Sequence, residues 1–414
     1  NQLTMEMMKK VADKHNYACL LHEKPFDGVN GSGKHNNWSI ITDTGENLLD
    51  PGKTPAENIQ FLVFLLATIA AVDEYADLMR VSVATAGNDH RLGANEAPPA
   101  VISVFVGDEL AEVLKSIDEG TAFKGTGKSS MSLGSAVLPH IMKDTTDRNR
   151  TSPFAFTGNK FEFRMPGSSL SVADPNIVLN TAVAEKLAEI YDALKDVKKR
   201  EMGDEVKKLL KKLLDAHKKV LFNGNGYTDE WLEEAKKRGL DNLKSLPDAM
   251  PRLVSDKAVA LFTKHKVFTE EELQSRYEIF LENYSKTIHI ESLTMQEMVR
   301  KDFTSGLVSY MKDVTNEALK KKQLLPQLKC TYEDEIITTL DETSEKISKS
   351  LDKLSKDTQK AEKETDELKA AKFYHETILA DMDALRSSVD KAEAIIPDGY
   401  LPYPTYGEML FSLR

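Results

Sequence analysis

Two hydrophobic periods are present in the first 175 residues of the chain, and together they predict a mixture of helices and strands. Apolar residues recur at every third or fourth position, as in amphipathic helices, in residues 5–15, 55–79 and 109–117. Alternating or β-branched stretches typical of strands occupy residues 38–42, 101–106 and 160–165. Loops rich in Gly, Asn and Pro are expected at residues 28–33, 87–99 and 146–159. We therefore expect an α+β fold here, with candidate sites in its loops.

From residue 174 onward the pattern is almost wholly helical. The amphipathic spacing is clearest in residues 183–194, 204–222, 228–237 and 293–319. An Asn-Gly-Asn-Gly run at residues 223–226 is interpreted as a helix end and turn, because no strand precedes it and the glycine spacing of a phosphate loop is missing. The second half is therefore expected to be a helical region.

A heptad pattern begins within this helical region. Apolar or neutral residues at 4–3 spacing, surrounded by Lys, Asp and Glu, are Ile347, Leu351, Leu354, Thr358, Ala361, Thr365 and Leu368. A second amphipathic arm, residues 373–395, either folds back on the first or pairs with another subunit. The aromatic tail, residues 397–414, is expected to pack back on the core. We assign these segments a structural or assembly role.

Charge and composition exclude several classes of function. The net charge of -11, from 66 acidic and 55 basic residues, argues against nucleic acid as a partner, since phosphate binding needs a basic face. Two cysteines, Cys19 and Cys330, fit a reducing compartment and give no thiolate metal site. The longest apolar run, residues 61–72, is about half of the roughly 20 residues that cross a bilayer, so no membrane span is expected. The chain opens with Asn1 inside an amphipathic pattern, and we expect the natural polypeptide to extend upstream.

The sequence FDGVNGSGKHNNWS at residues 26–39 is the strongest candidate for chemistry. Three glycines within residues 28–33 let the backbone approach a ligand closely. In the strand expected after them, His35, Asn37 and Ser39 would share one face. A neutral imidazole can bind a divalent metal, while the amide and hydroxyl can hold a sugar or phosphate. The alternative, if this stretch is taken alone, is that His35 has only a structural role.

A second stretch, NDHRLGANEAPP at residues 88–99, places Arg91 and Glu96 five residues apart in a loop shaped by Gly and Pro. The guanidinium could fork onto a carboxylate, and the glutamate could take a proton. An exposed ion pair is the alternative.

A third stretch contains RNRTSP at residues 148–153 and KFEFRMP at residues 160–166. Period-two alternation places Lys160, Glu162 and Arg164 on one strand face, and the intervening apolar residues on the other face against the core. A carboxylate flanked by cations suits a site for a metal and anions, such as ATP with a carboxylic acid. A solvated sheet face of mixed charge is the alternative.

Together and in this order, the three stretches resemble the glutamine synthetase family. The likeness is closest to the long type III enzymes, through GSGKHNNWS, RLGANEAPP and RNRTSPFAFTGNKFEFR. It covers nearly the whole chain, with the specific motifs in residues 1–175. The resemblance implies the C-terminal part of a catalytic domain, an antiparallel sheet with helices, followed by a large helical region with a coiled-coil-like hairpin. The implied domains are the catalytic portion, a helical region, the hairpin and a C-terminal tail, at residues 1–198, 199–335, 336–396 and 397–414.

The resemblance also implies an activity. Such enzymes are ligases that join ammonium to L-glutamate with ATP, through γ-glutamyl phosphate, giving glutamine, ADP and phosphate. They need Mg²⁺ or Mn²⁺ and form homo-oligomers, here expected to be a cytoplasmic dodecamer of stacked rings. Because the family's remaining metal ligands and N-terminal domain would lie upstream, we expect this chain alone to be inactive. The alternatives are a related ligase for another amine and a non-catalytic assembly or regulatory fragment.

The family's roles carry over to single positions of this chain. His35 and Glu162 match metal ligands, and Glu96 matches the flap residue that deprotonates ammonium. Arg150 matches the arginine that steadies the transferred phosphate and contacts the nucleotide.

The remaining matches concern the two substrates. Glutamate would contact Asn30, Gly31, Arg91 and Arg164. The nucleotide would contact Asn37, Ser39, Arg150 and Lys160. The chain departs from the shorter bacterial enzymes at Lys160, where they have Arg, and at residues 154–156, where it has Phe-Ala-Phe in place of a further arginine.

Overall fold

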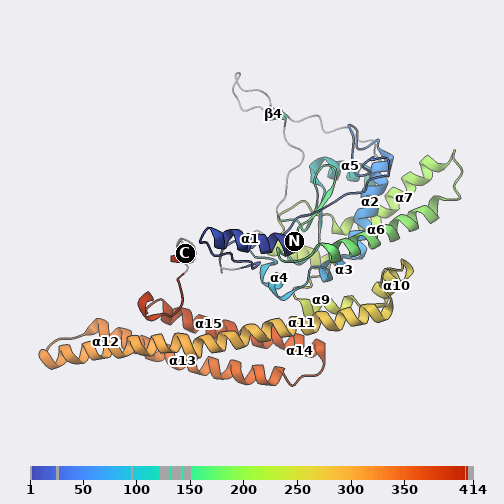
Figure 1. Cartoon of the computed structure of the whole chain (residues 1–414). Coiled ribbons are helices and arrows are strands. Elements are labelled where there is room, and N and C mark those ends of the chain that lie inside the picture. Colours follow the sequence, from blue (N-terminus) through green and yellow to red (C-terminus); the bar gives the residue numbers. More distant parts are fainter. Residues whose placement is uncertain are drawn as a thin grey trace. The chain divides into compact units, whose positions relative to one another are not determined.

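The computed structural model describes residues 2–24, 28–94, 97–121, 130–131, 141–142, 151–405 and 407–408, and Figure 1 follows the chain from its N-terminus to its C-terminus. The chain forms two compact units. The first contains Leu20–Tyr277, and the second contains Leu3–Cys19 with Glu278–Arg414. The four domains expected from the resemblance remain a prediction, because these units divide the chain on a different basis.

The first unit contains a small sheet of four strands. These strands are β1 (Asn36–Trp38), β2 (Val104–Phe105), β5 (Phe154–Phe156) and β6 (Phe161–Phe163). Their order is β1-β6-β5-β2; β6 runs antiparallel to both neighbours, and β2 is parallel to β5. A separate antiparallel pair is formed by β3 (Ser130–Met131) and β4 (Ile141–Met142). The α+β prediction is therefore confirmed, and β2 makes the expected antiparallel sheet a mixed one.

Helices supply most of the first unit's core. They are α2 (Ile59–Glu74), α3 (Ala76–Val81), α4 (Ala86–Arg91), α5 (Gly107–Glu119), α6 (Ala173–Leu194), α7 (Met202–His217), α8 (Asp229–Lys237), α9 (Leu246–Ala249) and α10 (Asp256–Lys264), with 3-10 turns η1 (Lys218–Val220) and η2 (Met250–Arg252). The apolar helix α2 packs against α6 and α7. It begins later than the pattern at residues 55–79 predicts, because the side chain of Asn58 caps it by accepting from Phe61 N at 3.1 Å.

Helices dominate the second unit. They are α1 (Gln2–Lys14), α12 (Thr304–Leu324), α13 (Thr331–Ala361), α14 (Glu367–Phe373) and α15 (Leu379–Glu393), with the 3-10 turn η5 (Asp398–Tyr400). Helix α11 (Glu270–Glu297) begins in the first unit and continues into the second. Two π-helical turns, η3 (Met298–Phe303) and η4 (Tyr374–Ile378), join α11 to α12 and α14 to α15. None of the helices in the described part of the chain has the length and apolar character of a membrane span.

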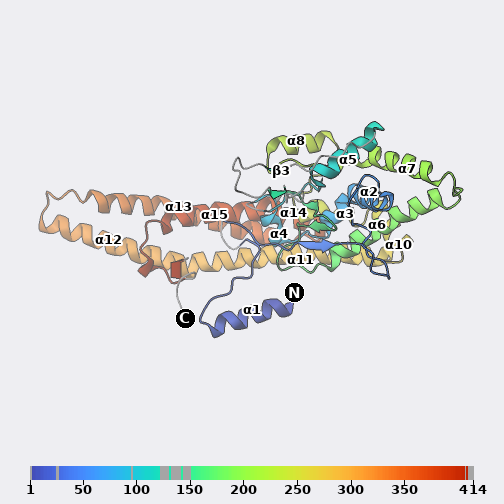
Figure 2. The ribbon, with the colours of Figure 1, turned by 90° about the horizontal axis from the view of Figure 1, so that it is seen from above.

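Helix α13 lies alongside α15 and α12, as Figures 1 and 2 both show. The second amphipathic arm, which contains α15, therefore folds back on the first arm, which belongs to α13. This is one of the two arrangements expected from the sequence pattern. The heptad seam is shorter than predicted: α13 ends at Ala361, and Thr365 is exposed in the turn that follows. Asp366 explains the break, because its side chain accepts from Lys369 N at 2.9 Å and caps a new helix.

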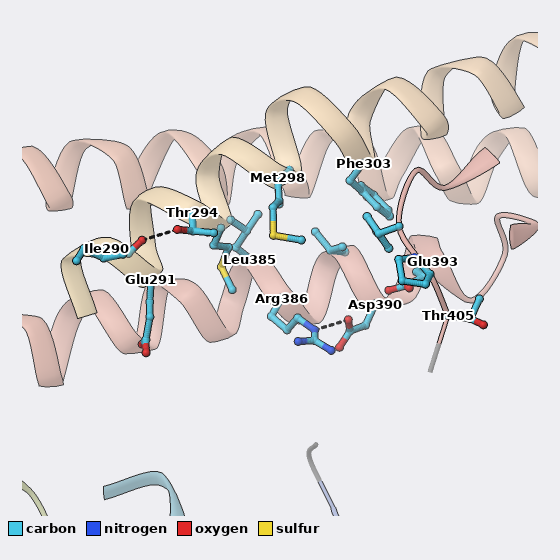
Figure 3. A pocket seen from close by; sticks show the side chains of 15 residues that line it. Ile290, Glu291, Thr294, Met298, Phe303, Leu385, Arg386, Asp390, Glu393 and Thr405 are labelled. Carbon is cyan, nitrogen blue, oxygen red and sulfur yellow. Dashed lines mark hydrogen bonds and ion pairs between the residues drawn. The ribbon is translucent and has the colours of Figure 1, made fainter. Parts of the chain in front are cut away.

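A cavity of about 530 Å³ opens in the second unit between α11, η3, α15 and the segment that follows η5. Its wall is mainly apolar, including Met298, Phe303 and Leu385, and at one side Arg386 pairs with Asp390 at 2.5 Å (Figure 3). Burial, with smaller effects from nearby charges such as Glu393, raises the pKa of the Tyr403 phenol in this wall to about 12. The tyrosine therefore stays neutral at physiological pH.

Candidate active site

The register of β1 against β6 assembles the first part of the site. Asn37 lies opposite Glu162 in this antiparallel pair. Directly opposed residues project to the same face of a sheet, and the residues flanking each strand continue that arrangement. The pairing thus brings the end of the glycine loop and the strand KFEFR together, although about 125 residues separate them in sequence.

The carboxylate of Glu162 is shared by two cationic or metal-binding side chains. Its Oε2 lies 3.5 Å from His35 Nδ1 and accepts from Arg164 Nε and Nη2, each at 3.2 Å. The side chains of Glu162 and Arg164 are 7% and 4% exposed, whereas that of His35 is 59% exposed. Of these three side chains, the imidazole is thus the exposed one, and the carboxylate and guanidinium are buried beside it.

The opposite face of β6 is apolar, as its alternation predicts. Phe161, Phe163 and Met165 are fully buried. The Phe154 ring stacks on Phe161 at 4.8 Å between centroids, and the Phe156 ring meets Phe161 edge-on at 5.2 Å. This aromatic layer fixes β6, so that Glu162 and Arg164 are held on the other face. The alternative of a solvated charged face is wrong, because both charged side chains are buried.

Arg91 lies at the end of α4, beside the residues that follow β6. Its Nη1 donates to Asn88 Oδ1 at 3.2 Å and to Met165 O at 2.9 Å, and its Nη2 donates to Arg164 O at 3.2 Å. Burial lowers the pKa of the guanidinium, an effect that the charge of Glu23 opposes. Because Arg91 is buried, it is not part of the exposed ion pair considered from sequence alone.

The glycine loop packs directly against this arginine. A Cβ at Gly33 would overlap the guanidinium of Arg91, and one at Gly31 would lie 3.2 Å from Arg91 Cγ and 2.8 Å from the carbonyl oxygen of Glu23. The loop also bonds to the turn after β6, through Lys34 N to Pro166 O at 2.9 Å. The glycines are thus needed for close packing of Arg91, while Asn30 of the same loop is exposed.

The sequence-predicted nucleotide contacts lie along and just beyond the β1–β6 pair. The hydroxyl of Ser39 donates to Asn47 Oδ1 at 2.7 Å and to Asn159 O at 3.1 Å, one residue before the half-buried Lys160. The amide of Asn37, which is exposed, donates to His35 O at 3.5 Å. Ser39 and Lys160 therefore flank one end of the β1–β6 pair, whereas Asn37 lies opposite Glu162 in its middle.

Two predicted residues, Glu96 and Arg150, lie outside the described residues. Within the described part of the chain, no group of three or more His, Cys, Asp or Glu side chains could hold a metal ion. His35 and Glu162 are thus a two-donor cluster there.

Sequence reasoning missed Glu23. This residue is 5% exposed, and its Oε1 accepts from Ser169 N at 3.0 Å and from the Ser169 hydroxyl. Its neighbours His22 and Lys24 are polar, so the local sequence shows no hydrophobic pattern that would predict burial. The partner that buries it stands 146 residues further along the chain, and no local pattern could have identified it.

Two models of one protein family match parts of the chain. A family model described as the glutamine synthetase catalytic domain matches residues 1–99, and one described as the glutamine synthetase C-terminal domain matches residues 205–322. The chain belongs to the glutamine synthetase family, whose members are ligases.

Three relatives show how much of such a protein the chain represents. It is 62% identical over 415 residues to a glutamine synthetase of Butyrivibrio fibrisolvens, covering 100% of this chain and 59% of the relative. It is 43% identical over 416 residues to the type-3 glutamine synthetase of Dictyostelium discoideum (99% and 57%). It is 39% identical over 421 residues to a glutamine synthetase of Bacteroides fragilis strain YCH46 (100% and 58%). The chain thus spans less than two thirds of each relative's length.

Proposed function

We propose that the chain is part of a type III glutamine synthetase, which joins ammonium to the side-chain carboxylate of L-glutamate with ATP. The observation that carries this proposal is the buried carboxylate of Glu162, placed between the imidazole of His35 and the guanidinium of Arg164 by the β1–β6 register. A metal-binding donor pair next to a buried cation suits a reaction between two anions, a carboxylate and a nucleoside triphosphate. The name of the Dictyostelium relative supports the type.

The residues present fit part of a divalent metal site. His35 Nδ1 and Glu162 Oε2 lie 3.5 Å apart, with the imidazole open to solvent, so both could bind one Mg²⁺ or Mn²⁺ ion. Two donors are fewer than the roughly six ligands of such an ion, so water, substrate or residues outside the described part of the chain would supply the others. When bound, the ion would polarise phosphoryl oxygens and offset their charge.

Glutamate would bind where the glycine loop, α4 and the end of β6 meet. Arg91 and Arg164 supply positive charge there, and Asn30 and Gly31 supply polar groups of the loop. In the structure Arg91 donates to the backbone carbonyls of residues 164 and 165. A substrate carboxylate would replace some of these acceptors and form stronger, charge-assisted hydrogen bonds.

Two chemical steps follow. An oxygen of the glutamate side-chain carboxylate attacks the γ-phosphorus of ATP, the bond from that phosphorus to the bridging oxygen breaks, and ADP leaves. Arg150 offsets the charge on the transferred phosphoryl group, while Asn37, Ser39 and Lys160 hold the nucleotide. Glu96 then takes a proton from ammonium, and the nitrogen attacks the acyl carbon of γ-glutamyl phosphate. The bond from that carbon to the phosphate oxygen breaks, phosphate leaves with the second proton that the nitrogen gives up, and glutamine is formed.

Assembly into a homo-oligomer, a cytoplasmic dodecamer of stacked rings, is also proposed. Exposed apolar side chains at the turn between α12 and α13 support assembly; they are Leu324, Leu325, Leu328 and Tyr332. Clustered apolar side chains on a protein surface commonly mark contacts with another subunit.

The test measures glutamine formation from glutamate, ammonium and ATP by the natural full-length polypeptide that carries this sequence. Glu162→Gln should lower kcat at least about 100-fold, because it removes the charge of a carboxylate that would hold the metal ion. The matched change Glu57→Gln, at an exposed carboxylate, should leave kcat unchanged. Absence of glutamine from the folded wild-type protein, or formation of a product with another amine only, would overturn the proposal.

A further inference from the structure

Glu23 has the environment of a residue that holds several segments in place. Its side chain is buried, yet His22 is exposed and Lys24 only half-buried. A buried carboxylate is costly unless hydrogen bonds satisfy it. Here they come from Ser169, through both its backbone N–H at 3.0 Å and its hydroxyl.

The backbone of the same residue binds a different segment. The carbonyl oxygen of Glu23 accepts from Ser32 N at 2.7 Å. Ser32 belongs to the glycine loop, whereas Ser169 belongs to the turn after β6. One residue thus connects the loop that contains Asn30 with the strand end that contains Arg164.

Helix α4 forms the third side of this environment. A Cβ at Gly87, in the first turn of α4, would lie 2.9 Å from Glu23 Oε2. A Cβ at Gly167 would lie 2.9 Å from Glu23 Cγ and 3.0 Å from its Oε1. Because real Cβ atoms do not approach so closely, any larger residue at Gly87 or Gly167 would force the buried side chain of Glu23 to shift.

The charge of Glu23 also acts on the cations that surround it. It opposes the lowering of pKa that burial imposes on Arg91 and on Lys34. The carboxylate therefore lowers the electrostatic cost of keeping a buried guanidinium beside the glycine loop.

We propose that Glu23 is a positioning residue, which fixes the glycine loop, helix α4 with Arg91, and the turn after β6 in the geometry that binds glutamate. This inference rests on the proposed function, because glutamate is the substrate assigned to that place. Groups that contact Glu23 belong to Ser169, Ser32, Gly87 and Gly167. None of these is among the residues proposed to contact the nucleotide, which include Asn37, Ser39 and Lys160. Glu23 should therefore affect glutamate more than ATP.

The first test compares KM for both substrates in the full-length enzyme. Glu23→Ala should raise KM for glutamate about 10- to 100-fold, since small displacements of positioning groups have effects of this size, and should change KM for ATP less than about twofold. Glu23→Gln should recover part of the loss, because its amide oxygen can still accept from Ser169. The control Glu57→Gln should match the wild type. Equal changes in both KM values, or none, would overturn the proposal.

The second test needs no catalytic activity. Gly87→Ala should lower the melting temperature in the wild-type background, because its methyl group meets the Glu23 carboxylate. In the Glu23→Ala background the same change should have little effect, since the side chain that it meets has been removed. Additive effects would show that the carboxylate does not contact α4. A wild-type protein that makes no glutamine would overturn the proposed function, and this coupling would still decide whether Glu23 ties the segments together.

Discussion

Buried polar groups are used differently in the sheet of the first unit and in the helical hairpin of the second. Around β6, charged side chains are buried on one face, and fully buried aromatic rings cover the other. In the helical hairpin and on α11 beside it, the buried polar groups are mainly neutral: Ser292 and Thr358 share a hydrogen bond of 2.9 Å, and Gln296 donates to both. One charged side chain, Asp381, is also buried there, with Lys353 as its ion-pair partner. The buried charges around β6 suit a place where ligand charges must be matched, whereas the hydroxyls and the amide of the second unit suit a place where hydrogen bonds specify packing.

The largest effect is expected where the aromatic layer supports the charged face. Phe163→Ala removes a fully buried ring that lies 6.0 Å from the Phe154 ring, and should lower the free energy of unfolding by about 3–5 kcal/mol. Urea unfolding of the first unit, followed by aromatic fluorescence, measures this. Phe163→Leu is the control and should cost less. A loss below about 1 kcal/mol for the alanine variant would show that β6 does not depend on its apolar backing.

The next effect concerns the neutral cluster of the hairpin. Thr358→Val removes the hydroxyl that bonds to Ser292 and Gln296, and should lower the free energy of unfolding by about 2 kcal/mol, because buried partners are left unsatisfied. Denaturant unfolding monitored by helical circular dichroism measures it. Adding Ser292→Ala should recover part of the loss. If the double variant is as unstable as the sum of both changes, the hydroxyl pair is not the cause.

A smaller effect is expected at an ion-pair cluster between α6 and α10. Burial alone would raise the pKa of Glu185, but hydrogen bonds from Lys264 at 2.6 Å and His265 at 2.7 Å lower it overall. A depressed carboxyl pKa stabilises the fold above the unfolded value, near pH 4.3, and the contribution is lost as the pH falls through the folded value. Glu185→Gln should thus cost about 1 kcal/mol at pH 7.

The pH series identifies the cause of that loss. The melting temperatures of wild type and Glu185→Gln should converge as the pH falls below about 4, where the carboxyl becomes protonated. A difference that stays constant down to pH 3 would mean that packing, and not charge, accounts for it.

The smallest effect is expected on the exposed face of α13. Lys349 pairs with Glu345 at 2.6 Å, and both side chains are exposed. Lys349→Ala should change the free energy of unfolding by less than about 0.5 kcal/mol, because solvent and salt screen such pairs. The same denaturant experiment measures it, with and without 1 M salt. A loss approaching that of Thr358→Val would contradict the contrast between buried and surface polar groups in the hairpin.

Local patterns predicted the parts of the site that depend on local geometry. Period-two alternation placed Glu162 and Arg164 opposite the phenylalanines. The motif identified His35 as a candidate metal ligand, and the β1–β6 register brings it to 3.5 Å from Glu162. The burial of Glu23 could not be predicted, because its partner Ser169 is remote in sequence. The end of α13 was also missed, since heptad spacing continues past Ala361 while the cap at Asp366 begins a new helix.

The π-helical turn η3 determines how the side chains of α12 are rotated about the helix axis relative to those of α11. An inserted residue in a helix displaces all later side chains by roughly 100° around the axis. Before η3, α11 presents Tyr284 and His289 to His375 and Tyr374 of η4, at 2.9 and 3.1 Å. After η3, α12 packs on α13. The two helices can thus pack against η4 and then against α13 with differently oriented faces. Deleting a single residue from η3 would rotate the contact face of α12 away from α13.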